Sequence, residues 1–151
     1  VPKKCWMDAA EDARYRIRND IETDIQGFDI DGDVIKSARE NAKLAGVDHL
    51  IHFQQRPVQE LSHRKKYGFI ITNPPYGQRL DSESEMPALY REIGEAYNRL
   101  DSWSMYLITA FEQAERYIGK KATKNRKIYN GMMKTYFYQY MGPRPPKKRD
   151  F

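Results

Sequence analysis

Residues 67–76 read YGFIITNPPY, a short apolar strand that runs directly into an asparagine, two prolines and a tyrosine. The near-continuous apolar residues predict that the strand is buried on both faces of a sheet. The two prolines lack backbone donors and fix their φ angles, so they end the strand and cannot extend its hydrogen-bond ladder. Asn73, Pro74, Pro75 and Tyr76 therefore form a strand exit that serves a purpose other than continuing the sheet.

Strands and helices alternate on either side of this stretch. The spacing of apolar residues predicts helices over residues 6–18, 34–45, 86–100 and 111–119. Apolar runs predict strands over residues 25–30, 49–55, 67–73 and 104–110. A hairpin of residues 123–130 and 131–141 follows, with its turn expected at Asn130-Gly131. This order predicts an α/β fold with a mostly parallel sheet, helices on both faces and one antiparallel edge strand.

Polar residues follow two of the predicted strands. Ligands of such sheets bind beyond the carboxyl ends of the strands, which places Asp29 and Asp31 at the same rim as Asn73. An acid at this position suits the two hydroxyls of a ribose, although it can equally cap the helix that follows. Asp31 fits the helix cap better, and Gly46 is the expected end of that helix. Asp29 is therefore the candidate ligand.

The exit at residues 73–76 suits an amine more specifically. The amide oxygen of Asn73 and the carbonyl of Pro74 are two acceptors that the proline rings hold in a fixed geometry. Together they match the two N–H groups of an exocyclic amine, and Tyr76 offers a ring on which a planar base could stack. The alternative is a rigid strand exit with a buried tyrosine.

Composition excludes several classes of protein. The 151 residues suffice for one domain, and no run of about 18 apolar residues is present, so we expect a soluble, cytoplasmic protein. The single Cys5 cannot form an internal disulfide. The histidines, at positions 49, 52 and 63, lack the spacing of a zinc site, although the first two could share one. We therefore expect no metal.

The positive charge is concentrated at the end of the chain. Residues 119–151 hold ten Lys/Arg and one acid, a net charge of +9, whereas the first 118 residues sum to −4. Five tyrosine and phenylalanine residues are interleaved with these cations, a combination that suits phosphate contact and base stacking. The alternative is a solvated hairpin followed by a disordered tail. Residues 142–151 are basic and Pro-rich, and we expect them to be a loosely ordered extension.

The motifs GFDID at residues 27–31 and TNPPYG at residues 72–77 resemble the class I, Rossmann-like S-adenosylmethionine-dependent methyltransferases that act on amino nitrogens. The order and spacing of the whole chain, with its terminal hairpin and basic tail, resemble more narrowly the THUMP-containing RNA methyltransferases. Members of that group methylate the N2 amine of guanine in large-subunit (23S) ribosomal RNA and are often described as N6-adenine-specific DNA methylases. The resemblance extends over essentially all 151 residues.

The resemblance implies a binding site for S-adenosylmethionine. Asp29 would bind the ribose hydroxyls of this cofactor, and Ile30 would pack on its adenine. Many relatives place an acid after the next strand to hold the adenine amine, whereas this chain has Pro57 there. Gln55 or the backbone near Val58 would serve instead.

The resemblance also assigns the target site. The target amine would be held by Asn73 and the Pro74 carbonyl, and Asn73 would border the cofactor as well. Pro75 would keep the loop rigid, and Tyr76 would stack on the flipped base. The reaction would be an in-line methyl transfer to nitrogen that depends on positioning and needs no strong general base.

Some parts of the family pattern are missing from this sequence. The glycine-rich motif after the first strand does not occur before Gly27, so the first strand, its glycine loop and the upstream THUMP domain are absent. We therefore expect a fragment, with residues 1–141 as a partial catalytic domain and residues 142–151 as the tail, inactive alone. The missing strand would be central in the sheet. Three alternatives stay open: a DNA N6-adenine methyltransferase, a protein-amide methyltransferase, and a non-catalytic RNA-binding module.

Overall fold

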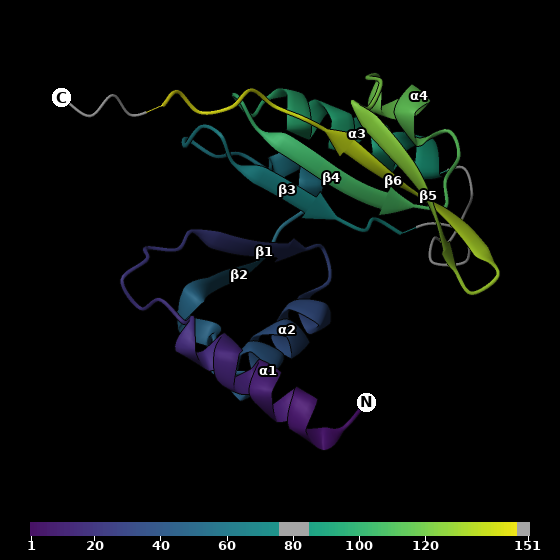
Figure 1. Ribbon diagram of the computed structural model, residues 1–151. Helices are drawn as coiled ribbons and strands as arrows, with labels where there is room; N and C mark the ends of the chain where they lie inside the picture. Colours follow the sequence, from purple (N-terminus) through teal and green to yellow (C-terminus); the bar gives the residue numbers. More distant parts are fainter. Residues whose placement is uncertain (76–84, 148–151) are drawn as a thin grey trace. The chain divides into compact units, whose positions relative to one another are not determined.

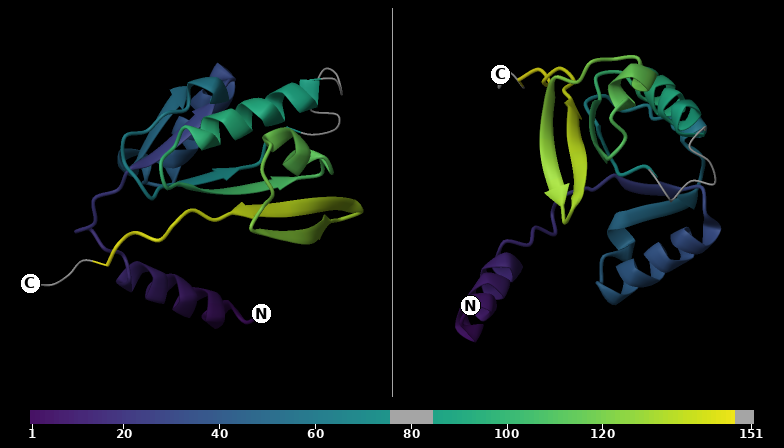
Figure 2. Two further views of the ribbon diagram at one scale, coloured as in Figure 1. Left: turned by 90° about the horizontal axis from the view of Figure 1, so that it is seen from above. Right: turned by 90° about the vertical axis from the view of Figure 1, so that its right-hand side faces the viewer.

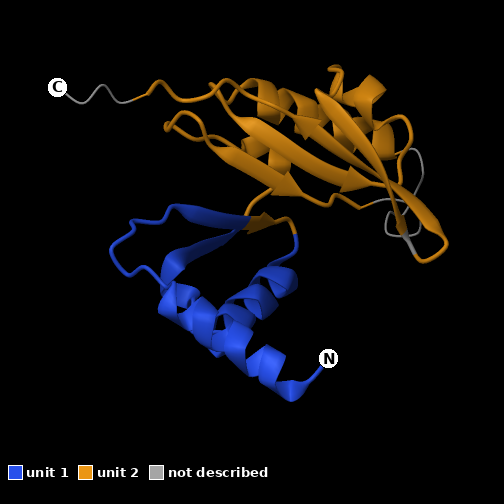
Figure 3. Ribbon diagram, viewed as in Figure 1, with its two compact units in different colours: residues 1–27, 31–54 blue, residues 28–30, 55–151 orange. Residues whose placement is uncertain are grey.

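The computed structural model describes residues 1–75 and 85–147. The chain divides into two compact units, residues 1–27 with 31–54, and residues 28–30 with 55–151 (Figure 3). Among the described residues there are two sheets: one pairs β1 with β2, and the other has the strand order β3-β4-β6-β5. In this part of the chain, β1 and β3 belong to different sheets.

The first unit contains a helix–strand–helix–strand sequence, although the last residues of both strands, 28–29 and 55, are assigned to the second unit. Its elements are α1 (Lys3–Tyr15), β1 (Ile25–Asp29), α2 (Gly32–Leu44), a short 3-10 turn (Asp48–Leu50) and β2 (Ile51–Gln55). Asp31 caps α2, because its carboxylate accepts a hydrogen bond of 2.8 Å from the backbone N–H of Asp33. Gly46, with φ of 69°, follows the last turn of the helix. The predictions for both residues are confirmed.

The second unit is a four-stranded sheet with two helices on one face (Figure 1). Its elements are a 3-10 turn (Val58–Glu60), β3 (Phe69–Thr72), α3 (Met86–Asn98), β4 (Ser104–Thr109), α4 (Ala114–Ile118), β5 (Lys124–Asn130) and β6 (Met133–Tyr140). β3 and β4 are parallel, and β6 runs antiparallel to both β4 and β5. The antiparallel strand therefore lies between two others, whereas the sequence led us to expect it at the edge.

The core of this unit lies between the sheet and the two helices (Figure 2). Side chains of β4 and β6 alternate between the two faces, and those on the helix side are buried. α3 and α4 approach closely at Gly94, where a Cβ atom would overlap the Ile118 carbonyl. The buried cluster is Tyr90, Ile93, Tyr97, Met105, Leu107, Ala114, Ile118, Tyr136, Tyr138 and Tyr140.

The opposite face of the sheet corrects one expectation. Phe69 and Ile71 of β3 are 65% and 84% exposed, so the strand is buried on one face only. Continuous apolar residues make both faces of a strand suitable for burial, but each face is buried only if another element covers it. The described helices of this unit cover one face of the sheet. Tyr106 and Phe137 continue the same face, and their rings stack 6.1 Å apart.

Candidate active site

The exit of β3 lies at the rim where both parallel strands end. In the register of the pair, Thr72 lies beside Leu107, so the residues after β3 and the end of β4 share one rim. Asn73 is exposed, Pro74 is buried and Pro75 is half-buried. The chain therefore presents an amide side chain at a backbone that two proline rings hold in place. Tyr76, the predicted stacking residue, lies outside the described residues.

A buried hydroxyl pair organises the neighbouring exit, that of β4. The hydroxyls of Tyr90 and Thr109 lie 2.5 Å apart, and Thr109 accepts a second hydrogen bond, 3.0 Å long, from the Phe111 backbone N–H. The ring of Phe111 packs against Tyr90 at 4.9 Å and stacks on Tyr117 at 5.7 Å. These contacts fix the loop that enters the same rim as Asn73.

A charged cluster attaches the terminal hairpin to this loop. One carboxylate oxygen of Glu112 accepts hydrogen bonds from Lys134 at 2.9 Å and from the Tyr136 hydroxyl at 2.8 Å. The hydrogen bond from Lys134, followed by that from Tyr136, lowers the pKa of Glu112. In turn, Tyr136 and Glu112 raise the pKa of Lys134, whose ammonium lies 5.0 Å from the centre of the Tyr136 ring. Lys134 is therefore charged at any physiological pH.

Neither of these arrangements was predicted from the sequence. The rule that ligands bind beyond strand ends was applied to residues 29 and 73 but not to the end of β4, where Thr109 and Glu112 lie. The same rule, applied also to the strand predicted over residues 104–110, would have identified the loop that follows β4. The pairing of Glu112 with Lys134 joins residues 22 positions apart and had no local signal.

Three of the residues proposed for the cofactor, Asp29, Ile30 and Gln55, lie at the ends of β1 and β2. Asp29 is half-buried, and its backbone carbonyl accepts a hydrogen bond of 2.8 Å from the N–H of Arg56. Ile30 is 71% exposed, and its carbonyl accepts a 2.9 Å hydrogen bond from the side-chain nitrogen of Gln55. Because Gln55 uses its nitrogen for this bond, its amide oxygen is the atom that could accept from a ligand. Val58 packs against the core of the second unit, and its carbonyl accepts from Leu61.

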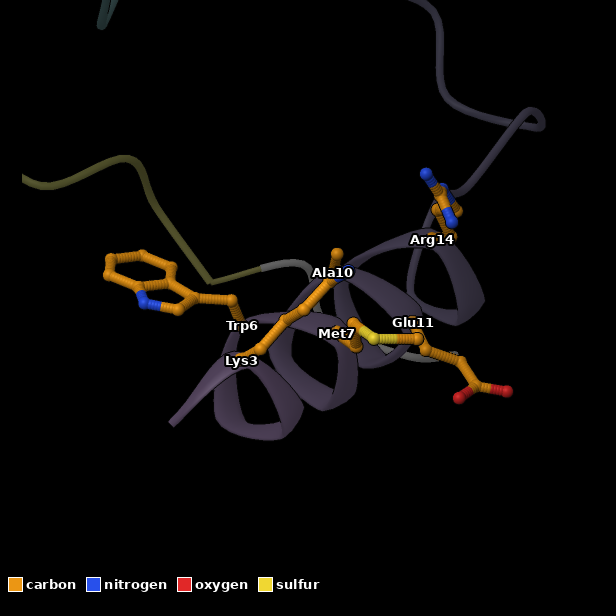
Figure 4. A pocket seen from close by; sticks show the side chains of 6 residues that line it. All are labelled: Lys3, Trp6, Met7, Ala10, Glu11 and Arg14. Atoms are coloured by element: carbon orange, nitrogen blue, oxygen red, sulfur yellow. The ribbon is translucent and has the colours of Figure 1, made fainter. Parts of the chain in front are cut away.

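Metal-binding clusters and surface hollows were the other candidates for a site among the described residues. The part of the chain that the structure describes has no group of three or more His, Cys, Asp or Glu side chains that could hold a metal ion. A hollow on α1 is lined by that helix alone (Figure 4), so it lacks a second wall that could enclose a ligand. The residues that line it are Lys3, Trp6, Met7, Ala10, Glu11 and Arg14. None of the described helices is long and apolar enough to cross a membrane.

Comparison with protein families identifies the fold. A model for UPF0020, described as the RMKL-like methyltransferase domain, matches residues 2–139. The chain belongs to this family. The sequence resemblance to methyltransferases is thereby confirmed, and the Asn-Pro-Pro exit of β3 lies inside the matched region.

Curated relatives of the RMKL-like domain are longer proteins. The chain is 38% identical over 150 residues to a Bacillus subtilis protein named "Putative RNA methyltransferase YpsC", a match that covers 99% of the chain and 39% of YpsC. It is 31% identical over 135 residues to the ribosomal RNA large subunit methyltransferase K/L of Marinobacter nauticus, covering 85% of the chain and 19% of that enzyme. The chain thus spans less than half of either protein.

Solved structures share the fold across nearly the whole chain. A structure described as a possible methylase from Clostridium difficile has 47% identity and a TM-score of 0.84, covering 98% of this chain and 39% of that one. The structure described as "SMU.472, a putative methyltransferase complexed with SAH" has 36% identity and a TM-score of 0.84, and the match covers 97% of this chain and 39% of that one. A Listeria monocytogenes structure described as a predicted N6-adenine-specific DNA methylase has 43% identity and a TM-score of 0.80, covering 94% and 36%. The α/β methyltransferase fold is therefore established.

Proposed function

We propose that the full-length protein containing this chain transfers a methyl group from S-adenosylmethionine to the N2 amine of a guanine in large-subunit ribosomal RNA. The observation that carries this proposal is the Asn73-Pro74-Pro75 exit at the carboxyl end of β3. Support comes from the family, from the RNA methyltransferase names of its relatives and from the SAH complex of SMU.472. We further propose that residues 1–141 are part of the catalytic domain, residues 142–151 are a basic tail, and a THUMP domain precedes them.

The residues at the end of β1 fit the cofactor. A half-buried carboxylate at Asp29 suits ribose hydroxyls, and the exposed side chain of Ile30 offers an apolar surface to an adenine ring. The Gln55 amide oxygen can accept from the adenine amine, and Val58 lies three residues further along the chain. When bound, S-adenosylmethionine supplies an electrophilic methyl group.

The residues at the end of β3 would hold and orient the amine. The Asn73 side-chain oxygen and the Pro74 carbonyl would accept its two N–H groups, which turns the nitrogen lone pair toward the methyl donor. Transfer would form an N–C bond to the methyl group as its S–C bond breaks, with S-adenosylhomocysteine as the leaving group and one amine proton released to water. Pro75 would keep this pair of acceptors rigid, and Tyr76 would stack on the base. No histidine or cysteine is needed, because the methylated nitrogen becomes acidic enough to lose its proton to solvent.

The basic end of the chain would bind the RNA. The cations of β5 are exposed on both faces of the hairpin, and Tyr129 is 68% exposed beside them. Exposed lysine and arginine suit phosphate groups, which give affinity without reading sequence. Residues 119–149 are therefore the proposed RNA-binding segment, with no metal involved.

Replacing Asn73 tests the proposed reaction. The substrate is ribosomal RNA from a strain that lacks the protein, and the readout is methyl transfer by the full-length enzyme with nucleoside analysis of the product. The Asn73→Ala variant loses one of two acceptors that orient the amine, so we expect at least a hundredfold lower rate with RNA affinity within twofold. Asn98→Ala, at an exposed asparagine at the end of α3, is the matched control and should keep the parent rate.

The product separates the competing functions. N2-methylguanosine in ribosomal RNA is the expected result. N6-methyladenine in DNA would support the alternative that the description of the Listeria structure suggests. Undiminished transfer by Asn73→Ala would contradict the role of this residue, and no transfer by the parent enzyme to RNA or DNA would favour a non-catalytic RNA-binding protein.

A further inference from the structure

The terminal hairpin extends past the rim that carries Asn73. β6 pairs with β4 only as far as Tyr136, which lies opposite Thr109, but it continues to pair with β5 up to Met133. Three residues of β6 therefore project beyond the end of β4, a distance of about 10 Å. Figure 1 shows the hairpin reaching past the ends of β3 and β4. The turn at its end thus lies beyond the same rim as the proposed target site.

The hairpin tip, residues 129–133, exposes apolar side chains. Tyr129, Met132 and Met133 are 68%, 100% and 49% exposed. Gly131 and Met132 are the two central residues of the turn, and the positive φ of Gly131, 61°, suits a two-residue hairpin connection. The sequence predicted the turn one residue earlier. Large apolar groups at the tip of a basic hairpin suit a partner that is both apolar and anionic.

Cations surround the tip on both faces. Lys127 and Lys134 lie on the same face as Tyr129, because paired residues of an antiparallel ladder share a face. Lys124 and Arg126 lie on the opposite face with Ile128. Glu112 is the acid in contact with this end of the hairpin, and it binds Lys134. Nucleic acid combines the flat apolar bases and the phosphates that such a surface fits.

The tip is held in one direction. Glu112 binds both Lys134 and Tyr136, and the Thr135 hydroxyl donates a 2.8 Å hydrogen bond to the Ile128 carbonyl across the hairpin. These bonds lie at the point where β6 leaves β4. The apolar side chains therefore project from a fixed support, as a group that separates stacked bases must.

We propose that the hairpin tip is a wedge that stacks against the RNA bases beside the target and holds open the space that the target base leaves. Tyr129 and Met132 would contact the neighbouring bases, while Lys127 contacts the backbone. This inference rests on the proposed function, because a base whose amine reaches Asn73 must first be unstacked. The further inference adds that side chains of the hairpin tip replace part of the stacking that the neighbouring bases lose when the target base leaves.

A comparison of folded and fragmented RNA tests the wedge. The full-length protein carries Tyr129→Ala with Met132→Ala, and the matched control carries Tyr15→Ala with Met7→Ala, which removes exposed side chains of the same types outside residues 119–149. One substrate is ribosomal RNA from a strain lacking the protein, folded with Mg²⁺. The other is the same RNA after partial alkaline cleavage into short single strands. Methyl transfer is measured on both.

The wedge is needed only where stacking must be broken. We expect the tip variant to lose about tenfold or more in kcat/KM on folded RNA, which matches the contribution of base stacking on an aromatic side chain. On fragments, where no stacking must be broken, we expect a loss of less than about twofold. Normal activity on fragments also shows that the variant is folded. Equal losses on both substrates, or no loss on either, would overturn the wedge and leave the proposed function intact. If the parent enzyme methylates neither RNA, the proposed function fails and the wedge fails with it.

Discussion

Glu112 is the residue on which the direction of the hairpin depends. Its pKa is lowered by Lys134 first and Tyr136 second, so the cluster contributes stability at pH values above the ordinary pKa of a glutamate. That contribution is lost as the pH falls through the lowered pKa. Glu112→Gln keeps the shape of the side chain but removes its charge. We expect amide hydrogen exchange in residues 128–135, corrected for intrinsic rates, to rise severalfold at pH 7 in this variant.

Acidification provides the second half of this test. Once the pH falls below the lowered pKa of Glu112, the parent protein should approach the exchange rates of Glu112→Gln, whereas the variant should change little over the same range. Glu95→Gln, at an exposed position on α3, is the control and should match the parent protein. If Glu112→Gln exchanged no faster than the parent at pH 7, the hairpin would be held by its strand pairing alone.

At the level of single residues, local signals could be predicted and long-range pairs could not. The cap at Asp31 followed from the residue type and its place before a helix, and the 2.8 Å bond confirms it. The positions of Asp29 and Asn73 followed from the strand-end rule, while their roles remain proposals. The bond between Gln55 and the Ile30 carbonyl spans 25 residues, so no periodicity in the sequence could indicate it.

At the level of elements, the contact between α3 and α4 depends on Gly94. Alanine in place of glycine inside a helix normally adds about 1 kcal/mol of stability. Here the new Cβ would overlap the backbone carbonyl of Ile118, which cannot move without shifting α4. Because overpacking costs about 1 to 3 kcal/mol, we expect Gly94→Ala to lower the free energy of unfolding, measured by chemical denaturation.

The control is Glu95→Ala, one residue along the helix, which should change the free energy of unfolding by less than about 0.5 kcal/mol. A more stable Gly94→Ala protein would mean that the two helices can separate without cost.

The elements themselves were predicted well because their patterns are local. Every predicted helix and strand is found, although the helix expected over residues 111–119 is reduced to Ala114–Ile118. The turn of the hairpin moved by one residue because Gly131 alone takes a positive φ there. The burial of β3 was wrong for a different reason. Apolar composition indicates that a face is suited to burial, but it does not show whether anything covers Phe69 and Ile71.

For the molecule as a whole, buried tyrosines set the behaviour in base. Desolvation raises the pKa of Tyr138 to about 12 and raises those of Tyr97 and Tyr140 above their ordinary value of 10. The unfolded chain would therefore ionise these phenols before the folded one does. Stability is fully present below pH 10, and we expect it to fall between pH 10 and about 12. Urea unfolding at several pH values, combined with tyrosinate absorbance, measures both effects.

Replacing two of these tyrosines separates their contributions. Tyr138→Phe removes one titrating group, so stability should fall less steeply above pH 10 than in the parent protein. The Tyr140 hydroxyl is buried without a hydrogen-bond partner among the residues described, and leaving such a group unsatisfied costs about 1 to 3 kcal/mol. Tyr140→Phe should therefore stabilise the protein already at pH 7 and flatten the decline in base as well. A loss of stability at pH 7 would show that this hydroxyl has a partner, such as a buried water, in solution.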